Sequence, residues 1–256
     1  MNLWHSLVFG VVEGITEFLP ISSTGHLMLT AKLLGVGQSD FIKSFEIAIQ
    51  LGAILAVVVL YWPRLSKGVE IWKRLLAAFV PAAVIGALVY GLIKKYLLVS
   101  NEVVLWSLCI GGLALIVFEL LHREKEDATD ELSAITYPQA VCIGLFQCLA
   151  MVPGVSRSAA TIIGGLTAGL KRKAVVEFSF LLAVPTMAAA TALDLSKSAG
   201  SFNMDQFIFL GTGFCVSFVV AAAAIKFLLA FIRRHTFIAF GVYRVAAALV
   251  FWFIIK

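Results

Sequence analysis

The sequence predicts an all-α polytopic membrane protein made of two inverted-topology repeats, each a re-entrant helix-loop-helix hairpin plus three transmembrane helices. Of its 256 residues, 61% are hydrophobic and only 14% are charged, whereas roughly half of the residues of a soluble domain are apolar. Mean hydropathy is +0.99. Apolar runs of roughly 20 residues, long enough to cross a bilayer, recur along the chain. Two of these runs are interrupted by a proline followed by serines, and they resemble each other.

The first element covers residues 3–35, an apolar stretch broken at residues 19–25 by the sequence Leu-Pro-Ile-Ser-Ser-Thr-Gly. Proline removes a backbone donor and restricts the residue before it, and the hydroxyl residues that follow favour helix N-caps. We expect two half-helices that meet at this break in a re-entrant hairpin, because non-helical backbone at membrane depth is tolerated only inside protein or beside a water-filled cavity. A single span kinked at Pro20 is the alternative.

Unbroken apolar stretches of spanning length follow each of the two broken segments. The second broken segment covers residues 138–170 and is interrupted at 152–158 by Val-Pro-Gly-Val-Ser-Arg-Ser. Between the halves, residues 122–131 carry charges of both signs and are expected to be a solvated connector. The predicted spans are about residues 45–62, 75–93, 103–121, 175–195, 207–232 and 236–255.

The two broken segments align with each other, which indicates a tandem duplication. A looser match between the stretches that start at Glu46 and Glu177 extends the repeats to about residues 1–131 and 136–256 of one integral membrane domain, residues 1–256. A hairpin does not cross the membrane and three helices cross it an odd number of times, so the second repeat must be inverted, as in many transporter folds. The aligned pairs are Gly10 with Gly144, Glu13 with Gln147, Pro20 with Pro153, Ser23 with Ser156 and Thr24 with Arg157.

Basic residues in the loops predict the orientation. If the loop at 63–74 is cytoplasmic, that face carries eleven Lys and Arg residues and the opposite face six. The positive-inside rule then puts both termini outside the cytoplasm, with the first hairpin opening outward and the second inward. The six basic residues assigned to the outer face are Lys32, Lys43, Lys94, Lys95, Lys197 and Lys256.

Other features narrow the function classes. The four cysteines lie in apolar stretches without ligand spacing, so small buried side chains are expected rather than disulfides or a metal site. The net charge of +5 reflects loop residues that any multispanning protein carries, so nucleic acid is not expected as a partner. The start of the chain lacks a basic region and a small-residue cleavage site, so no cleaved signal is expected. Membrane lipids are expected around the protein, and the sequence leaves a homodimer open.

Two glutamates in the first broken segment are the most informative charges. Ionisable groups inside apolar segments cost at least about 2.5 kcal/mol each and are functional candidates. Glu13 and Glu17 stand four residues apart on one helix face, about 5–6 Å from each other, so a cation or a proton is needed between them. Mg²⁺ or Ca²⁺ suits carboxylate ligands; a protonated, hydrogen-bonded Glu is the alternative. Gly10 and Gly14 on the same helix permit a neighbouring helix to approach closely.

The break of the first hairpin carries hydroxyl groups and a histidine. Ser22, Ser23 and Thr24 could be explained by helix capping alone. His26 follows three residues after Ser23, where it could move a proton, although an isolated intramembrane His more often bonds neighbouring helices. On the first span, Gln50 is a candidate to support the site, with an interhelical hydrogen bond as the simpler interpretation.

The break of the second hairpin carries the opposite charge. A guanidinium at Arg157, at the start of a half-helix, offers forked donors that suit a phosphate. Ser156, Ser158 and Thr161 surround it, and a salt bridge to Glu13 or Glu17 that only holds the repeats together is the alternative. If the two hairpins meet at their tips, one cavity holds a carboxylate-bound metal and an arginine. This combination favours a phosphate ester or pyrophosphate site over a cation channel.

The segments at 13–26, Glu-Gly-Ile-Thr-Glu-Phe-Leu-Pro-Ile-Ser-Ser-Thr-Gly-His, and at 153–161, Pro-Gly-Val-Ser-Arg-Ser-Ala-Ala-Thr, resemble the two signature motifs of the undecaprenyl-pyrophosphate phosphatase family, also called bacitracin-resistance proteins. The resemblance covers essentially the whole chain. It implies a metal-dependent enzyme of the bacterial cytoplasmic membrane that hydrolyses undecaprenyl pyrophosphate to undecaprenyl phosphate and inorganic phosphate. That reaction recycles the lipid carrier of peptidoglycan synthesis and confers bacitracin resistance, and the active site is expected to be reachable from the extracytoplasmic side.

The resemblance also implies roles for individual residues. Glu13 and Glu17 match the acidic motif and are expected to hold Mg²⁺ or Ca²⁺. From the chemistry of the residues, Ser23 is expected to be the nucleophile and His26 to move its proton, while Glu17 and Arg157 complete the catalytic set. The alternative, in which Ser23 only orients a water, stays open. Ala159 stands where the motif has glycine, a small change. The residues expected to bind the polyprenyl pyrophosphate substrate are Ser22, Thr24, Ser156, Arg157, Ser158 and Thr161.

Three rival functions remain open from the sequence. A secondary transporter shares the architecture of inverted repeats with broken helices, but it would accumulate substrate without consuming it. An enzyme that also returns the lipid carrier to the inner leaflet is compatible with hairpins that open to opposite sides. A membrane scaffold would not keep so many polar groups at membrane depth.

Overall fold

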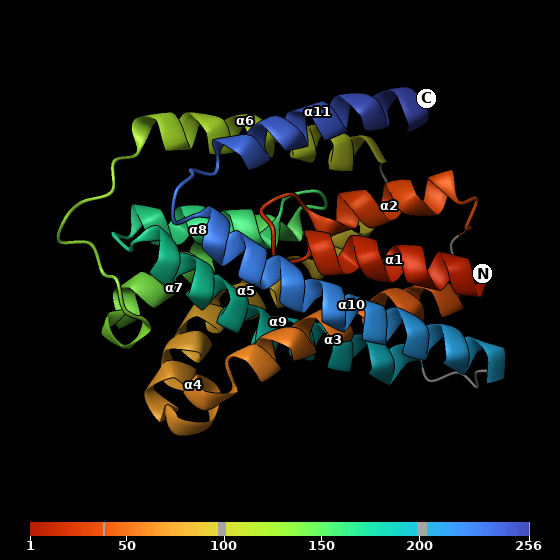
Figure 1. Cartoon of the computed structure of the whole chain (residues 1–256), viewed down its shortest axis with the longest axis horizontal. Helices are drawn as coiled ribbons and strands as arrows, with labels where there is room; N and C mark the ends of the chain where they lie inside the picture. The colour runs from red at the N-terminus through yellow and green to blue at the C-terminus, as the bar shows by residue number, and fades with distance from the viewer. Residues whose placement is uncertain (38, 97–100, 199–203, 256) are drawn as a thin grey trace.

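In the computed structural model, residues 1–37, 39–96, 101–198 and 204–255 are described, and they form helices joined by short loops (Figure 1). No side chain is described for residues 67, 90, 92–96, 192–198 and 255. Five of the basic residues used to predict the orientation are therefore not fully described. Lys256 lies outside the described residues, and so do the side chains of Lys67, Lys94, Lys95 and Lys197.

Residues 3–33 form two helices separated by a short break. α1 covers Leu3–Thr16 and α2 covers Ser23–Leu33, so the break falls at residues 17–22. The side chain of Asn2 satisfies the start of α1 by accepting a hydrogen bond of 2.9 Å from the backbone N–H of His5. Ser22 is the N-cap of α2 as the hydroxyl residues predict, but it does not cap through its side chain and has a φ of +73°. A serine in this left-handed region is strained, which is common at functional sites.

The helices of the rest of the first half are long and apolar. α3 covers Asp40–Leu60, a short α4 covers Trp62–Lys67, and α5 covers Val69–Tyr96. α6 covers Asn101–Leu121 and leads into the connector. Ser39 caps α3 by accepting from the N–H of Ile42 at 3.2 Å.

The second broken segment has a second pair of short helices. A 3-10 turn, η1 (Leu132–Ala134), precedes α7 (Tyr137–Gln147), and η2 (Cys148–Met151) precedes α8 (Arg157–Thr167). Thr136 and Gln139 form a capping box at the start of α7, and Ser156 caps α8 by accepting from the N–H of Ala159 at 3.2 Å. Arg157 therefore occupies the first turn of α8.

Three further helices complete the chain: α9 (Arg172–Ser198), α10 (Met204–Phe231) and α11 (Ile238–Ile255). Within the described residues, five helices, α3, α5, α6, α9 and α10, are long and apolar enough to cross a membrane. The sixth predicted span corresponds to α11, one of three shorter apolar helices with α1 and the α7–η2 segment. The prediction of an all-helical, multi-pass membrane protein is confirmed.

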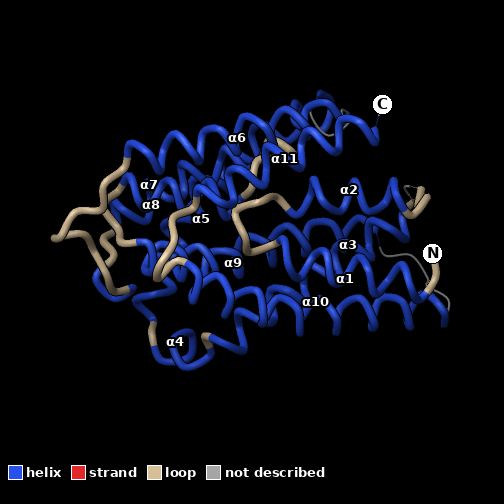
Figure 2. Tube along the Cα trace, turned by 45° about the horizontal axis from the view of Figure 1, so that its top comes forward, coloured by secondary structure: helices blue, strands red, loops and turns tan. Residues whose placement is uncertain are grey.

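Both termini lie at one end of the molecule, and the connector between α6 and α7 lies at the other (Figures 1 and 2). α1 and α2 lie toward the end with the termini, whereas α7 and α8 lie toward the connector (Figure 1). The two broken segments therefore approach the middle of the bundle from different ends.

Glycines allow the half-helices to pack closely against long helices. A Cβ atom added to Gly14 of α1 would lie 2.7 Å from Cβ of Val220 and 2.8 Å from the carbonyl oxygen of Ser217, both in α10. In the second half, a Cβ at Gly144 of α7 would collide with the carbonyl oxygen of Ala78 in α5. The expectation that Gly14 permits close helix approach is confirmed.

A buried arginine connects the two breaks. Arg244 of α11 is 1% exposed, and its guanidinium donates to the carbonyl oxygens of Pro20 at 3.4 Å and Gly154 at 3.2 Å. It also donates to the carbonyl oxygens of Ser107 at 3.0 Å and Leu108 at 3.4 Å in α6. One side chain of the last helix thus holds non-helical backbone from both halves of the chain.

We expect Gly14→Leu to destabilise the fold, because overpacking a close helix contact typically costs about 1–3 kcal/mol. Gly211→Leu is the matched control, since an added Cβ at this α10 position meets no atom within 4 Å. Thermal unfolding of the purified proteins in detergent measures the difference. Equal melting temperatures for the two variants would contradict the assigned packing.

Arg244→Met is expected to loosen both breaks together, because an unsatisfied buried carbonyl costs about 1–3 kcal/mol. Hydrogen exchange should accelerate at residues 17–22 and 152–156, and the melting temperature should fall. The exposed Arg234→Met provides the control. Faster exchange at one break alone would show that the arginine does not couple them.

Candidate active site

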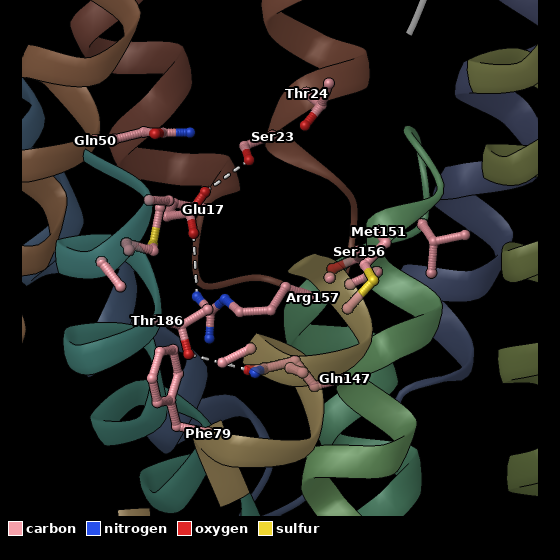
Figure 3. A pocket seen from close by; sticks show the side chains of 18 of the residues that line it. Glu17, Ser23, Thr24, Gln50, Phe79, Gln147, Met151, Ser156, Arg157 and Thr186 are labelled. Carbon is pink, nitrogen blue, oxygen red and sulfur yellow. Dashed lines mark hydrogen bonds and ion pairs between the residues drawn. The ribbon is translucent and has the colours of Figure 1, made fainter. Parts of the chain in front are cut away.

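The two breaks line a shared cavity of about 760 Å³ (Figure 3). Its walls come from both hairpins and from α3, α5 and α9. The apolar part of the wall consists mostly of small residues of α5 and α9, among them Ala82, Ala83 and Ala190. The polar side chains that line it are Glu17, Ser22, Ser23, Thr24, Gln50, Gln147, Ser156, Arg157 and Thr186.

Glu17 and Arg157 form an ion pair that joins the two breaks. Arg157 Nη2 lies 3.1 Å from Glu17 Oε1, and the side chains are 12% and 5% exposed. The other carboxylate oxygen of Glu17, Oε2, accepts a hydrogen bond of 2.6 Å from the hydroxyl of Ser23. Ser23, Glu17 and Arg157 form a continuous polar chain in Figure 3. The predicted proximity of Glu17 and Arg157 is confirmed.

The remaining contacts of Arg157 hold its guanidinium in place. Nη1 donates to the carbonyl oxygen of Ser179 in α9 at 2.9 Å, and the guanidinium carbon lies 5.9 Å from the centre of the Phe18 ring. Nε of Arg157 has no hydrogen-bond partner among the described residues. The arginine thus keeps a donor that a phosphate oxygen could occupy.

Glu13 lies one turn before Glu17 and is fully buried. Neither of its carboxylate oxygens accepts a hydrogen bond within the described part of the chain, and the carboxylates of Glu17 and Glu46 are close enough to interact with it. The charge of Arg157 offsets this repulsion only in part. A buried carboxylate beside other acids is unfavourable unless it binds a proton or a cation, and Glu13 itself does not line the cavity.

These donors fit a hard divalent cation in part. Carboxylate oxygens are what Mg²⁺ and Ca²⁺ prefer, and Mg²⁺ is often held by one or two carboxylates together with substrate phosphate oxygens. Among the described residues, no group of three or more His, Cys, Asp or Glu side chains could hold a metal ion. Glu13 and Glu17 would therefore supply only part of a coordination shell.

His26 lies beside the cavity but does not line it. Its Nδ1 donates to the carbonyl oxygen of Ser22 at 2.8 Å, so Nε2 of the neutral ring accepts from the hydroxyl of Tyr243 at 2.7 Å. The ring also stacks on Tyr243, with centroids 5.5 Å apart. His26 is expected to move the proton of Ser23, but these contacts do not join the two residues, and the group bonded to Ser23 is Glu17.

The other predicted substrate-binding residues divide into two groups. Ser22, Thr24 and Ser156 line the cavity with Arg157. Ser158 and Thr161 are fully buried behind it. The hydroxyl of Ser158 donates to the carbonyl oxygen of Phe18 at 2.7 Å, and Thr161 Oγ1 lies 2.6 Å from Ser179 Oγ. These two residues hold the breaks against each other and against α9 in this structure.

Gln50 and Gln147 line the cavity on either side of the Glu17–Arg157 pair (Figure 3). Gln50 comes from α3 and lies on the side of Ser23. It was predicted as a residue that supports the site, and its position in the cavity wall is compatible with that role. Gln147, at the end of α7, is 3% exposed and its Oε1 lies 3.4 Å from the hydroxyl of Thr186 in α9.

Five polar residues in or near the site were not predicted: Gln147, Ser179, Thr186, Tyr243 and Arg244. Arg244 is a charge inside a predicted span, so the rule that flagged Glu13 would also have found it. Ser179 and Tyr243 lie in apolar stretches as single uncharged polar residues, and Thr186 follows Pro185, which does not interrupt α9. Only the packing of α9 and α11 brings them to the hairpins.

Comparison with known proteins identifies the family. Residues 6–250 match the family described as "Bacitracin resistance protein BacA". The chain is 52% identical over 251 residues to the undecaprenyl-diphosphatase of Aquifex aeolicus, with 98% of both chains covered. It is 49% identical to that of Persephonella marina, with 98% of both chains covered. It is also 50% identical over 260 residues to that of Campylobacter hominis, with 100% of both covered. The resemblance in the two motifs is thus confirmed, and the chain belongs to the bacitracin resistance protein family.

Proposed function

We propose that this membrane protein hydrolyses undecaprenyl diphosphate to undecaprenyl phosphate and inorganic phosphate. The reaction recycles the lipid carrier for peptidoglycan synthesis and confers bacitracin resistance. The names of the relatives support the substrate. The observation that carries the chemistry is the buried Glu17 carboxylate, bonded to a serine hydroxyl on one oxygen and to an arginine on the other.

Ser23 is the nucleophile in this proposal, and Glu17 accepts its proton along the 2.6 Å hydrogen bond. The Ser23 oxygen attacks the terminal phosphorus, the bond to the bridging oxygen breaks, and undecaprenyl phosphate leaves. Water then attacks the phosphorus of the phosphoserine, the Ser23 oxygen leaves and takes the proton back from Glu17, and inorganic phosphate is released. Arg157 binds the charge on the transferring phosphoryl group, where positioning and electrostatic stabilisation supply most of the rate.

The roles of the remaining predicted residues follow from their contacts. Ser22, Thr24 and Ser156 offer hydroxyl groups to the phosphate oxygens from the wall of the cavity. Ser158 and Thr161 support the binding site through the backbone of Phe18 and through Ser179. His26 acts as a proton-transfer group in this proposal. Its ring must first rotate, so that Nε2 leaves the hydroxyl of Tyr243 and faces the cavity.

Glu13 and Glu17 would hold a divalent ion, Mg²⁺ or Ca²⁺, completed by oxygens of the substrate. When bound, the ion neutralises phosphate charge. The buried oxygens of Glu13, which have no hydrogen-bond partner among the described residues, support this assignment.

The cavity opens to the extracytoplasmic side in this proposal. Its exposed lining residues include Thr24, Ala87 and Ala190. α5 and α9 both start next to basic loop residues and run toward the end with the termini (Figure 1), and the positive-inside rule puts the basic loops in the cytoplasm.

The two halves are inverted repeats in this proposal, with boundaries at about residues 1–131 and 136–256. Equivalent helices pack on equivalent partners: α1 contacts α10, and its counterpart α7 contacts α5. The aligned glycines make the contact in both halves. An added Cβ at Gly10 would lie 2.8 Å from the carbonyl oxygen of Gly213, and one at Gly144 would collide with that of Ala78.

Purified protein in detergent should release inorganic phosphate from undecaprenyl diphosphate, and EDTA should stop the release. No gradient exists in detergent, so a transporter would leave the lipid intact. Colorimetric detection of phosphate, with Mg²⁺ or Ca²⁺ restored after chelation, measures the effect. An intact substrate in the presence of metal would refute the proposal.

Glu17→Gln, Ser23→Ala and Arg157→Met should each lower the rate constant at least about 100-fold, the usual effect of losing a proton-transfer or charge-stabilising group. The exposed Glu102→Gln provides a control. Acid quench of a single turnover with radiolabelled terminal phosphate should trap label on wild-type protein and none on Ser23→Ala. Full turnover without trapped label on wild type would mean that Ser23 only orients water.

A further inference from the structure

The amide of Gln147 has hydrogen-bonding capacity that the protein does not use. The side chain lines the cavity and is 3% exposed, and its Nε2 has no hydrogen-bond partner among the described residues. The hydroxyl of Thr186 is the one group within reach of the amide in those contacts, at 3.4 Å. The amide has two N–H groups and Thr186 can accept only one of them, so a donor stays free whichever way the amide is turned.

A free buried donor costs about 1–3 kcal/mol unless a ligand uses it. The same place in the first hairpin is occupied by Glu13, according to the alignment of the two breaks. At this position the first repeat has a carboxylate that is fully buried and does not line the cavity, and the second has a neutral donor that does line it. A neutral donor suits an oxyanion, and whereas Arg157 is paired with Glu17, the Gln147 amide nitrogen has no carboxylate partner among the described residues.

The order of the polar groups along the cavity indicates which phosphate of the substrate lies beside Gln147. Ser23, Arg157 and Gln147 follow one another in Figure 3, with the Glu17–Arg157 pair between the two ends. In phosphoryl transfer the attacking and leaving oxygens lie roughly in line with the phosphorus. If Ser23 attacks a phosphorus bound at Arg157, the leaving group must point away from Ser23, toward Gln147.

We propose that Gln147, held by Thr186, binds the phosphate that is attached to the lipid, so that the cavity contains two phosphate subsites. This inference rests on the proposed function, because it takes Ser23 and Arg157 as the groups that act on the terminal phosphate. The wall around Gln147 and Thr186 includes Phe79 and small residues of α5, surroundings that suit the first units of a prenyl chain. Gln147 is therefore a specificity residue for a lipid diphosphate.

The test compares two products as ligands of the full-length protein in detergent: undecaprenyl phosphate and inorganic phosphate. Gln147→Met keeps the length of the side chain and removes both donors, and Gln147→Glu adds a repelling charge. Gln50→Met is the matched control, a glutamine that lines the other side of the same cavity. Inhibition constants of both ligands are measured with radiolabelled substrate. For a variant without turnover, the rise in melting temperature caused by each ligand replaces the inhibition constant.

In Gln147→Met, the affinity for undecaprenyl phosphate should fall about tenfold, equivalent to about 1.4 kcal/mol, while the affinity for inorganic phosphate changes less than about twofold. Gln147→Glu should show a larger selective loss, and Gln50→Met should leave the ratio of the two affinities unchanged. Equal losses for both ligands in Gln147→Met, or none for the lipid phosphate, would overturn the subsite. A wild-type protein that releases no phosphate would instead refute the proposed function.

Discussion

The ion pair between Glu17 and Arg157 is the constraint on which the rest of the site depends. Each charge is almost completely removed from water, and a buried charge without its partner typically costs about 3–5 kcal/mol. The pair joins the end of one half-helix to the start of another that lies 140 residues away in sequence. It therefore holds the tips of the hairpins together and sets the distance between the serine and the arginine that face the cavity.

The long helices stabilise the two non-helical breaks inside the membrane bundle. Backbone that leaves helical geometry at membrane depth needs protein or water around it. The first break packs on α9 through Phe18, the second lies against α6 at Gly154, and α11 contacts both through Arg244. Their carbonyl oxygens are satisfied by side chains, among them Ser158 on Phe18 and Arg244 on Pro20 and Gly154. Glycines such as Gly14 let α1 lie directly on α10. Close packing and side-chain donors together replace the hydrogen bonds that the broken helices lose.

Much of this arrangement could be predicted from the sequence, because membrane helices are encoded in long apolar runs and their breaks in proline and serine. The six predicted spans overlap six helices, and both breaks fall near the predicted residues. The proximity of Glu17 and Arg157 followed from two opposite charges at two breaks. The position of His26 could not be predicted, since its ring orientation is set by Tyr243 on the last helix. Arg244 was overlooked for a different reason: its helix has no break to draw attention to it.

The location of Arg244 has a consequence for biosynthesis. Its helix, α11, is synthesised after both turns whose backbone oxygens Arg244 binds. Until α11 is inserted, the carbonyls of Pro20 and Gly154 lack these donors. A nascent chain that has not yet made α11 would contain Glu17 and Arg157 but not the donors that hold the two turns, so the cavity takes its final shape only after α11 has entered the bundle.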